Sequence, residues 1–155
     1  MIVRAAVPQD AEGMALVVNA VIAVGGTTAH EHAKSVEAVR RDYITKPELR
    51  SSVVAEDGGV VIGWQSVEFW KGALHIGTFV DPGIQARGIG AALFAATCGI
   101  LRPLAPAHII ASIRADNVPG LAYYARMGFR DVAQEPEFAL KDGRVDGRVH
   151  RRFDF

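Results

Sequence analysis

A strand-like run that leads through a basic, glycine-punctuated turn into a helix is the feature that most limits how this chain folds. Residues 80–96 read VDPGIQARGIGAALFAA, and apolar residues recur at helical spacing from Ile89 to Ile100. Gly88 and Gly90 allow the backbone to come close to another group, and the N–H groups of a first helical turn have no partner within the helix. The turn therefore predicts an anion site at the start of this helix.

Periodicity along the rest of the chain predicts a mixed sheet with helices on its faces. The runs at residues 51–55 and 60–70 flank a GluAspGlyGly turn, which is typical of an antiparallel hairpin. Further strands are expected near residues 2–6, 73–80, 108–114, 129–140 and 147–154, and helices near residues 11–24, 35–43, 89–100 and 118–127. This order predicts one domain, residues 1–155, of the α/β (α+β) class.

Two local expectations can be checked directly. Asp10 precedes the first helical stripe and is predicted to be its N-cap. Gly77 lies inside the strand at residues 73–80 and predicts a β-bulge or the close approach of another backbone.

Composition excludes several classes of function. Seventeen basic side chains balance seventeen acidic ones, which argues against a broad nucleic-acid-binding surface. Cys98 is the only cysteine, so an intramolecular disulfide and a cysteine-based metal cluster are excluded, and its place inside a predicted helix disfavours an acyl-cysteine intermediate. The start of the sequence has no signal-peptide pattern and no run reaches roughly 18 apolar residues, so a cytoplasmic protein without membrane contact is expected.

Two common phosphate-binding motifs do not fit the turn. A P-loop requires Lys and then Ser or Thr after its last glycine, whereas Gly90 is followed by AlaAlaLeu. A dinucleotide fingerprint requires a third glycine, where this chain has Leu93. Nucleoside-triphosphate hydrolysis and NAD binding are therefore not expected.

The hexamer QARGIG at residues 85–90 and the stretch NVPGLAYYARMGF at residues 117–129 together resemble the two signatures of the GNAT superfamily of N-acetyltransferases. The first resembles its acyl-CoA pyrophosphate loop, and the second its Asn followed by a short helix that ends in Tyr-x-x-x-Gly-Phe. The resemblance implies the GNAT fold, a mixed and mostly antiparallel sheet of about six to seven strands with helices on both faces. It also implies acetyl-CoA as co-substrate and direct transfer of the acetyl group to an amine.

The resemblance implies two sets of contacts to acetyl-CoA. Backbone groups of the strand before the loop bind the pantetheine arm, where the next strand splays away, and Asn117 contacts the CoA arm. The loop binds the pyrophosphate. The cofactor-binding residues implied in this way are Thr78, Phe79, Val80, Gln85, Ala86, Arg87, Gly88, Ile89, Gly90, Ala91, Asn117 and Tyr124.

Candidates for the chemistry follow from the same resemblance. Tyr124 stands four residues before Gly128, as the family's proton-donating tyrosine does, and the adjacent Tyr123 is assigned to packing. His75 stands ten residues before Gln85, where the phosphinothricin acetyltransferase-like branch has a glutamate, and an imidazole is a suitable base for an ammonium proton. Glu68, on the preceding strand, is the second candidate base.

The sequence indicates less about the acceptor than about acetyl-CoA. The stretch GGTTAHEH resembles that same branch and implies an acceptor contact by Thr28, His30 and Glu31, with no metal. His150, Arg151 and Arg152 are either edge charges or substrate ligands. The expected partner is a small amine or amino-acid-like acceptor, and a homodimer is possible. The alternatives are a protein or peptide N-terminal acetyltransferase, a non-catalytic acyl-CoA-binding sensor and a structural partner subunit.

Overall fold

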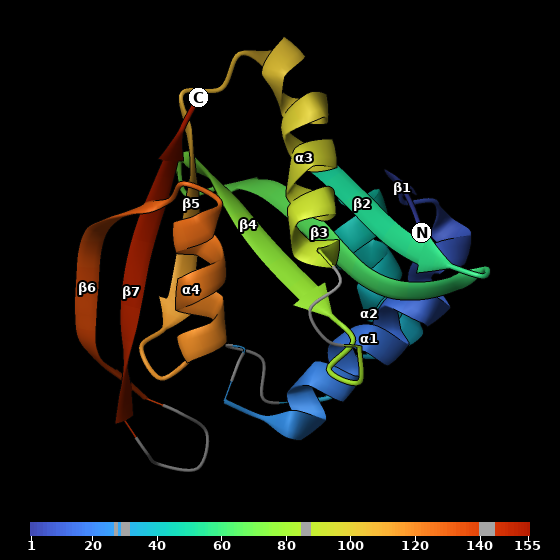
Figure 1. The fold of residues 1–155 in the computed structure, drawn as a ribbon, viewed down its shortest axis with the longest axis horizontal. Coiled ribbons are helices and arrows are strands. Elements are labelled where there is room, and N and C mark those ends of the chain that lie inside the picture. The colour runs from blue at the N-terminus through green and yellow to red at the C-terminus, as the bar shows by residue number, and fades with distance from the viewer. Residues whose placement is uncertain (27, 29–31, 85–87, 140–144) are drawn as a thin grey trace.

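The computed structural model describes residues 1–26, 28, 32–84, 88–139 and 145–155, and within them seven strands form one sheet (Figure 1). The strands are β1 (Ile2–Ala5), β2 (Leu49–Asp57), β3 (Val60–Trp70), β4 (Ala73–Val80), β5 (His108–Arg114), β6 (Arg130–Ala139) and β7 (Val145–Asp154). The helices are α1 (Ala11–Val24), α2 (Val36–Arg40), α3 (Ile89–Leu101) and α4 (Val118–Arg126), with shorter helical turns at Pro8–Asp10, Arg41–Thr45 and Arg102–Leu104.

The strands follow the order β1-β2-β3-β4-β5-β7-β6 across the sheet. All neighbours are antiparallel except β4 and β5, which are parallel. The expected mixed and mostly antiparallel sheet of the α/β (α+β) class is therefore confirmed.

Strands β4 and β5 separate soon after they meet. Their pairing is limited to Leu74 with Ile109 and His75 with Ile110, and both strands continue beyond it without pairing to each other. Figure 1 shows the two ribbons diverging from this point. The backbone edges that face the opening are therefore available to a ligand.

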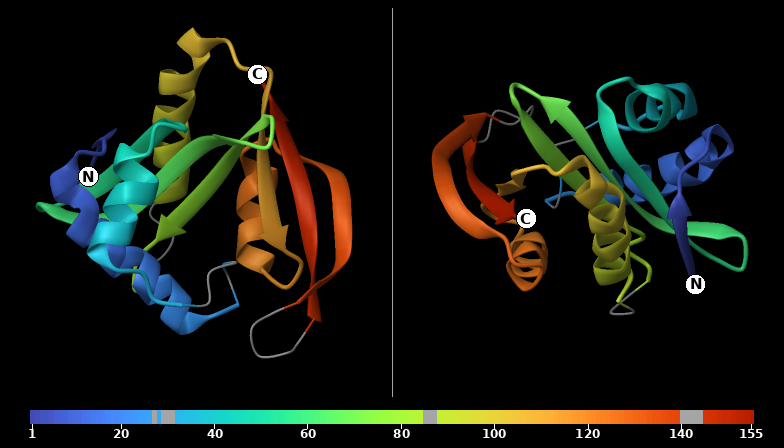
Figure 2. Two further views of the ribbon diagram at one scale, coloured as in Figure 1. Left: turned by 180° about the vertical axis from the view of Figure 1, so that it is seen from behind. Right: turned by 90° about the horizontal axis from the view of Figure 1, so that it is seen from above.

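Helices cover both faces of the sheet, as the right view of Figure 2 shows. On one face α3 and α4 pack against a cluster that includes Ile76, Ile109 and Phe129. On the other face α1 and α2 pack around Trp64, which is fully buried and donates through its indole Nε1 to the Met14 carbonyl at 3.0 Å. Because side chains alternate along a strand, Ile76 and Thr78 of β4 face α3 and α4, whereas His75, Gly77 and Phe79 face the side of α1 and α2.

The two local predictions have different outcomes. Asp10 is the N-cap residue of α1, as predicted, but its side chain makes no capping hydrogen bond, because its carboxylate accepts from the Val7 N–H at 2.8 Å and from the Arg4 guanidinium at 2.8 Å and 2.9 Å. Gly77 does not form the predicted bulge, because β3 and β4 pair in continuous register from Gly63 with Val80 to Trp70 with Ala73. The alternative, the close approach of another backbone at Gly77, stays a prediction. The opening beside β4 arises from the early end of the β4 and β5 pairing and needs no extra residue.

Candidate active site

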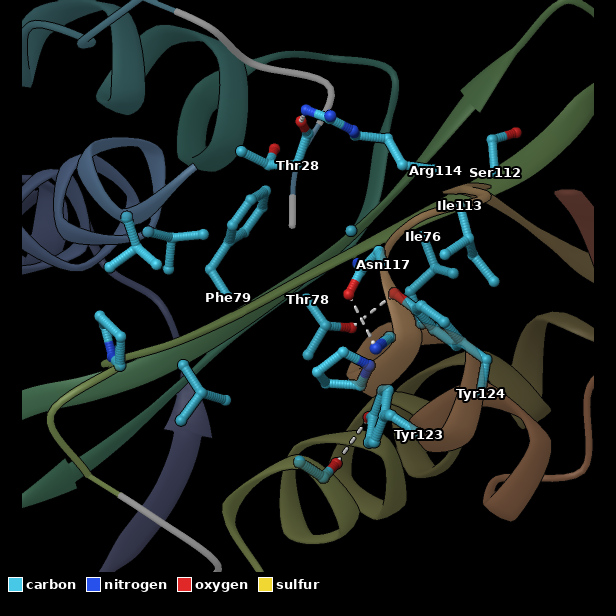
Figure 3. A pocket seen from close by; sticks show the side chains of 18 of the residues that line it. Thr28, Ile76, Thr78, Phe79, Ser112, Ile113, Arg114, Asn117, Tyr123 and Tyr124 are labelled. Carbon is cyan, nitrogen blue, oxygen red and sulfur yellow. Dashed lines mark hydrogen bonds between the residues drawn. The ribbon is translucent and has the colours of Figure 1, made fainter. Parts of the chain in front are cut away.

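A cavity of about 570 Å³ lies where β4 and β5 diverge (Figure 3). Its walls come from β4, β5, α4, the start of α3 and the end of α1, so segments far apart in the sequence meet there. The residues that line it include Val21, Thr28, Ile76, Gly77, Thr78, Phe79, Val80, Asp81, Ile84, Gly90, Ser112, Ile113, Arg114, Asn117, Pro119, Gly120, Tyr123, Tyr124 and Arg148.

The start of α3 has the geometry that anion binding requires. Gly88 adopts a left-handed conformation with φ of 69°, and a Cβ added there would meet nothing within 4 Å among the described atoms. The Ala92 N–H donates to the Gly88 carbonyl at 3.0 Å, so the N–H groups of residues 89–91 precede this bond and have no partner within the helix. Ile89 is buried in the core, whereas Gly88 and Ala91 are exposed and Gly90 lines the cavity.

Gln85, Ala86 and Arg87, which the sequence also assigns to the cofactor, lie outside the described residues. His30 and Glu31, predicted at the acceptor, do so as well. Their roles stay predictions.

Gly90 is small for a reason that the sequence did not suggest. A Cβ at this position would lie 2.6 Å from Cε1 of the Tyr123 ring, and the Tyr123 hydroxyl donates to the Gly90 carbonyl at 2.7 Å. Gly90 therefore lets α4 dock closely on the first turn of α3. Tyr123, predicted as a packing residue, also carries this hydrogen bond and lines the cavity.

A buried glutamine organises the polar groups on this side of the cavity. Gln65 of β3 is fully buried, accepts from Thr97 Oγ1 at 2.5 Å, and donates through Nε2 to Thr78 Oγ1 at 2.9 Å and to Tyr123 Oη at 3.1 Å. Thr78 Oγ1 in turn lies 2.9 Å from Tyr124 Oη (Figure 3). Sequence reasoning missed Gln65, because a single polar residue within a strand carries no motif.

Tyr124 is almost completely buried, with 8% of its surface exposed. Burial raises the pKa of its phenol well above the ordinary value, which outweighs the lowering by the hydrogen bond to Thr78. The hydroxyl therefore stays protonated and acts as a hydrogen-bond donor. Asn117, the N-cap of α4, accepts from the Gly120 N–H at 2.9 Å and lines the same cavity.

Two buried arginines also line the cavity. Arg114 of β5 and Arg148 of β7 are 5% and 6% exposed, and they face each other directly in the antiparallel register. Arg114 binds Asp116 through two hydrogen bonds of 3.0 Å and 2.9 Å and donates to the Thr28 carbonyl at 3.3 Å. Figure 3 shows Thr28 beside Arg114. Two guanidinium groups therefore line this part of the cavity, and one of them is paired with Asp116.

The two predicted bases lie outside the cavity lining. His75 packs edge-on against Trp70 at 5.2 Å between ring centroids, and burial lowers its pKa below the ordinary value in spite of a hydrogen bond with the Trp70 backbone. Glu68, its cross-strand partner, forms an ion pair with Lys46 at 2.8 Å. Cys98 is buried, and burial raises the pKa of its thiol, which makes the nucleophilic thiolate harder to form.

Two further observations concern only the described residues. None of their helices is long and apolar enough to cross a membrane. Within the same residues, no three His, Cys, Asp or Glu side chains lie close enough together to hold a metal ion.

Sequence relatives share parts of this chain. The mycothiol acetyltransferase of Clavibacter michiganensis subsp. michiganensis is 36% identical over 75 residues, which is 48% of this chain and 24% of that protein. The L-methionine sulfoximine/L-methionine sulfone acetyltransferase of Salmonella typhimurium is 26% identical over 98 residues, 59% of this chain and 57% of that protein. The chain therefore matches only part of the length of each relative.

Solved structures match the fold over nearly the whole chain. The phosphinothricin acetyltransferase of Sinorhizobium meliloti, in complex with AcCoA, has a TM-score of 0.86 and 23% identity, with 99% of this chain and 88% of that chain covered. The ribosomal-protein-alanine N-acetyltransferase of Brucella melitensis has a TM-score of 0.88 and 20% identity, with 100% of both chains covered. At these identities the likeness shows the fold.

The sequence pattern of the acetyltransferase (GNAT) family matches residues 23–129, which contain the opening between β4 and β5, the start of α3 and all of α4. The match covers more than half of the chain and includes both stretches that carried the resemblance. The chain belongs to the acetyltransferase (GNAT) family.

Proposed function

We propose that this protein is an acetyl-CoA-dependent N-acetyltransferase that acts on the primary amine of a small amino-acid-like acceptor. The observation that carries the proposal is the cavity between β4 and β5, which is lined both by the start of α3 and by the buried Tyr124. It offers in one place an anion site, unpaired strand edges and a hydroxyl donor.

The residues present fit acetyl-CoA. The N–H groups of residues 89–91 and the left-handed Gly88 suit a pyrophosphate, since a helix N-terminus stabilises negative charge. The backbone of Thr78, Phe79 and Val80 runs along the opening past the last β4 and β5 pair, where a pantetheine arm can bond like an added strand. Asn117 lines the same cavity. When bound, acetyl-CoA supplies an activated acetyl group.

Tyr124 is placed to assist departure of the thiolate. Acyl transfer forms an N–C bond and breaks the C–S bond, so negative charge grows on sulfur as the reaction proceeds. The high pKa of the Tyr124 phenol makes complete proton transfer to a thiolate unfavourable, because a free thiol is the stronger acid. We infer that Tyr124 acts mainly by donating a hydrogen bond to the developing charge.

The two arginines suggest that the acceptor has a carboxylate. Arg114 and Arg148 face each other across the sheet, and guanidinium groups bind carboxylates well, so an acceptor carboxylate can bind here beside the Asp116 that already pairs with Arg114. The relative from Salmonella acts on L-methionine sulfoximine and L-methionine sulfone, which are amino acids and have such a carboxylate. An α-amino acid whose carboxylate binds here would have its amine in the same cavity as Tyr124.

Release of free thiol from acetyl-CoA, measured with an acceptor panel, tests the proposal. The panel includes L-methionine sulfone, L-methionine sulfoximine, the amine left when the carboxylate of L-methionine sulfone is removed, and a peptide with a free N-terminal alanine. We expect the two amino acids to give the highest kcat/KM. A preference for the peptide favours N-terminal acetylation instead, and tight acetyl-CoA binding without thiol release favours a sensor.

Arg148→Gln tests the carboxylate assignment. A hydrogen bond to a charged group contributes about 1.5–3 kcal/mol, so KM for L-methionine sulfone should rise about tenfold to a hundredfold. KM for the amine without the carboxylate should change little, which serves as the internal control for folding. An equal change in both KM values contradicts the assignment.

A further inference from the structure

Three side chains from three neighbouring strands form a continuous hydrogen-bonded chain at the wall of the cavity. Ser112 Oγ of β5 lies 2.8 Å from His150 Nδ1 of β7, and His150 Nε2 lies 2.7 Å from Glu135 Oε1 of β6. Ser112, at one end of this hydrogen-bonded chain, lines the cavity. Glu135, at the other end, faces solvent with 54% of its side chain exposed. None of the three belongs to the two sequence signatures.

The chemistry of the three groups sets the direction of these bonds. Ionised Glu135 can only accept, so neutral His150 carries its hydrogen on Nε2 and donates it to the carboxylate. His150 Nδ1 then has a lone pair and accepts the Ser112 hydroxyl hydrogen. Ser112 Oγ in turn keeps its lone pairs for a donor in the cavity, such as an ammonium group.

We propose that Ser112, His150 and Glu135 form a proton relay that removes the proton from the acceptor ammonium before transfer. The proposal rests on the proposed function. The ammonium gives one proton to Ser112 Oγ while the Ser112 hydrogen passes to His150 Nδ1. The products are a neutral amine with its lone pair free, an intact Ser112 hydroxyl and an imidazolium that is paired with Glu135. The imidazolium later releases its proton to solvent.

Charged groups of both signs lie on the same face of the sheet as His150. Glu135 is hydrogen-bonded to the His150 ring, and several cationic side chains lie on the same face of the sheet. Among the described residues, cross-strand register also puts the following charged or titratable groups on this face of the sheet: Glu68 of β3, His75 of β4, His108 and Arg114 of β5, Arg130 and Glu135 of β6, and Arg148, Arg152 and Asp154 of β7. The site of the relay agrees with the acceptor position, because Ser112 lies two residues from Arg114 on β5.

This assignment differs from the base predicted from sequence. His75 bonds to the Trp70 backbone and does not line the cavity, whereas Ser112 does. The same three groups also resemble a nucleophilic Ser, His and acid arrangement, in which Ser112 would itself accept the acetyl group. The experiment therefore has to separate proton relay from a covalent acetyl-Ser112.

The kinetic test compares pH profiles of kcat/KM for L-methionine sulfone in the full chain. In the wild type, kcat/KM should fall on acidification as the imidazole takes up a proton. Ser112→Ala and His150→Gln should each lower kcat/KM by about a hundredfold or more. Both should also lose this fall at acidic pH, the acid limb of the profile, and keep only the increase of kcat/KM with pH that comes from deprotonation of the acceptor amine. Glu135→Gln should keep the limb but move it to lower pH, because the imidazolium loses its carboxylate partner.

Matched variants control for structural effects. Ser112→Thr keeps the hydroxyl and should retain most of the activity and the limb. His108→Gln, at the start of β5, and His75→Ala should both leave the limb in place. Aminooxyacetate has a carboxylate and an amine that is already neutral near neutral pH. With it as acceptor, Ser112→Ala should recover to within about tenfold of the wild type.

Three results overturn the relay. One is that Ser112→Ala and His150→Gln both remain active and both keep an unchanged fall of kcat/KM at acidic pH. Another is an acetyl-Ser112 adduct in the intact mass of acid-quenched wild type, which would assign Ser112 as nucleophile. The third result does not need turnover: it is an NMR spectrum of the imidazole protons and nitrogens that shows the His150 hydrogen on Nδ1. In contrast, absence of thiol release with every acceptor overturns the proposed function, even if NMR finds the hydrogen on Nε2.

Discussion

Thr78 Oγ1 lies 2.9 Å from Tyr124 Oη, and this contact joins the strand that borders the cavity to the helix that closes it. Because Thr78 already accepts from Gln65, its own hydrogen can go to Tyr124 Oη. Tyr124 then keeps its O–H for a group in the cavity. A hydroxyl that would otherwise rotate freely is in this way held in one donor orientation.

Tyr124→Phe should separate binding from chemistry. The ring stays in the core and only the hydroxyl is lost, so we expect acetyl-CoA affinity to remain nearly unchanged and kcat to fall about tenfold to a thousandfold. Isothermal calorimetry and single-turnover kinetics measure the two quantities. An unchanged rate of the chemical step would assign Tyr124 to packing alone.

Gln65→Met should affect the rate through Tyr124. The variant keeps the volume of the side chain but leaves the partners of Gln65 unsatisfied, so the free energy of unfolding should fall by about 1–3 kcal/mol and kcat by about tenfold. In a Tyr124→Phe background the same change should lower the unfolding free energy again and leave kcat unaltered. A full additional loss of kcat in the double variant would show that Gln65 acts by another route.

Gly88→Asp should weaken acetyl-CoA binding through its charge. Asp and Asn both tolerate the left-handed conformation of this residue, so Gly88→Asn is the matched neutral control. We expect the Kd for acetyl-CoA to be at least about tenfold higher in the Asp variant than in the Asn variant, a difference of about 1.4 kcal/mol. Equal Kd values in two folded variants would contradict the anion site at the start of α3.

Gly90→Ala should destabilise the docking of α4 on α3. The new methyl would lie 2.6 Å from the Tyr123 ring, so one of the two helices has to shift, at a cost of about 1–3 kcal/mol in unfolding free energy. Tyr123→Leu, which removes the ring, should make the added methyl much less costly. Denaturant unfolding of the double-mutant cycle measures this coupling, and strictly additive effects would contradict the packing account.

Asp10 should contribute to stability in a pH-dependent manner. Its hydrogen bonds from Arg4 lower the pKa of the carboxyl, and the favourable interaction is present above the unfolded-state value near 4 and is lost as the pH falls through the lower folded-state value. Asp10→Asn should therefore lower the unfolding free energy by about 1–2 kcal/mol at neutral pH. The difference between the two proteins should shrink below about pH 4, and a difference independent of pH would contradict the ion-pair account.

The sequence by itself determined the elements and predicted the anion site. Hydrophobic periodicity and turn residues act over short stretches, so the strand and helix order could be predicted, and the turn with Gly88 is contiguous with the helix whose start it forms. The resemblance added Tyr124 and Asn117, which the structure brings to the same cavity as Thr78. The bulge at Gly77 was predicted wrongly, because a glycine in a strand has several possible causes and only pairing distinguishes them.

Tertiary structure alone decided which distant side chains meet. Arg114 faces Arg148, and Ser112 meets His150 and Glu135, because β7 returns between β5 and β6 in a particular register. A shift of one residue in that register would turn His150 to the opposite face of the sheet. Gln65 reaches Thr78 as its cross-strand partner on β4, whereas it reaches Thr97 and Tyr123 only because α3 and α4 pack on that face. Strand order and register depend on how the whole core packs, so no local stretch of sequence encodes them.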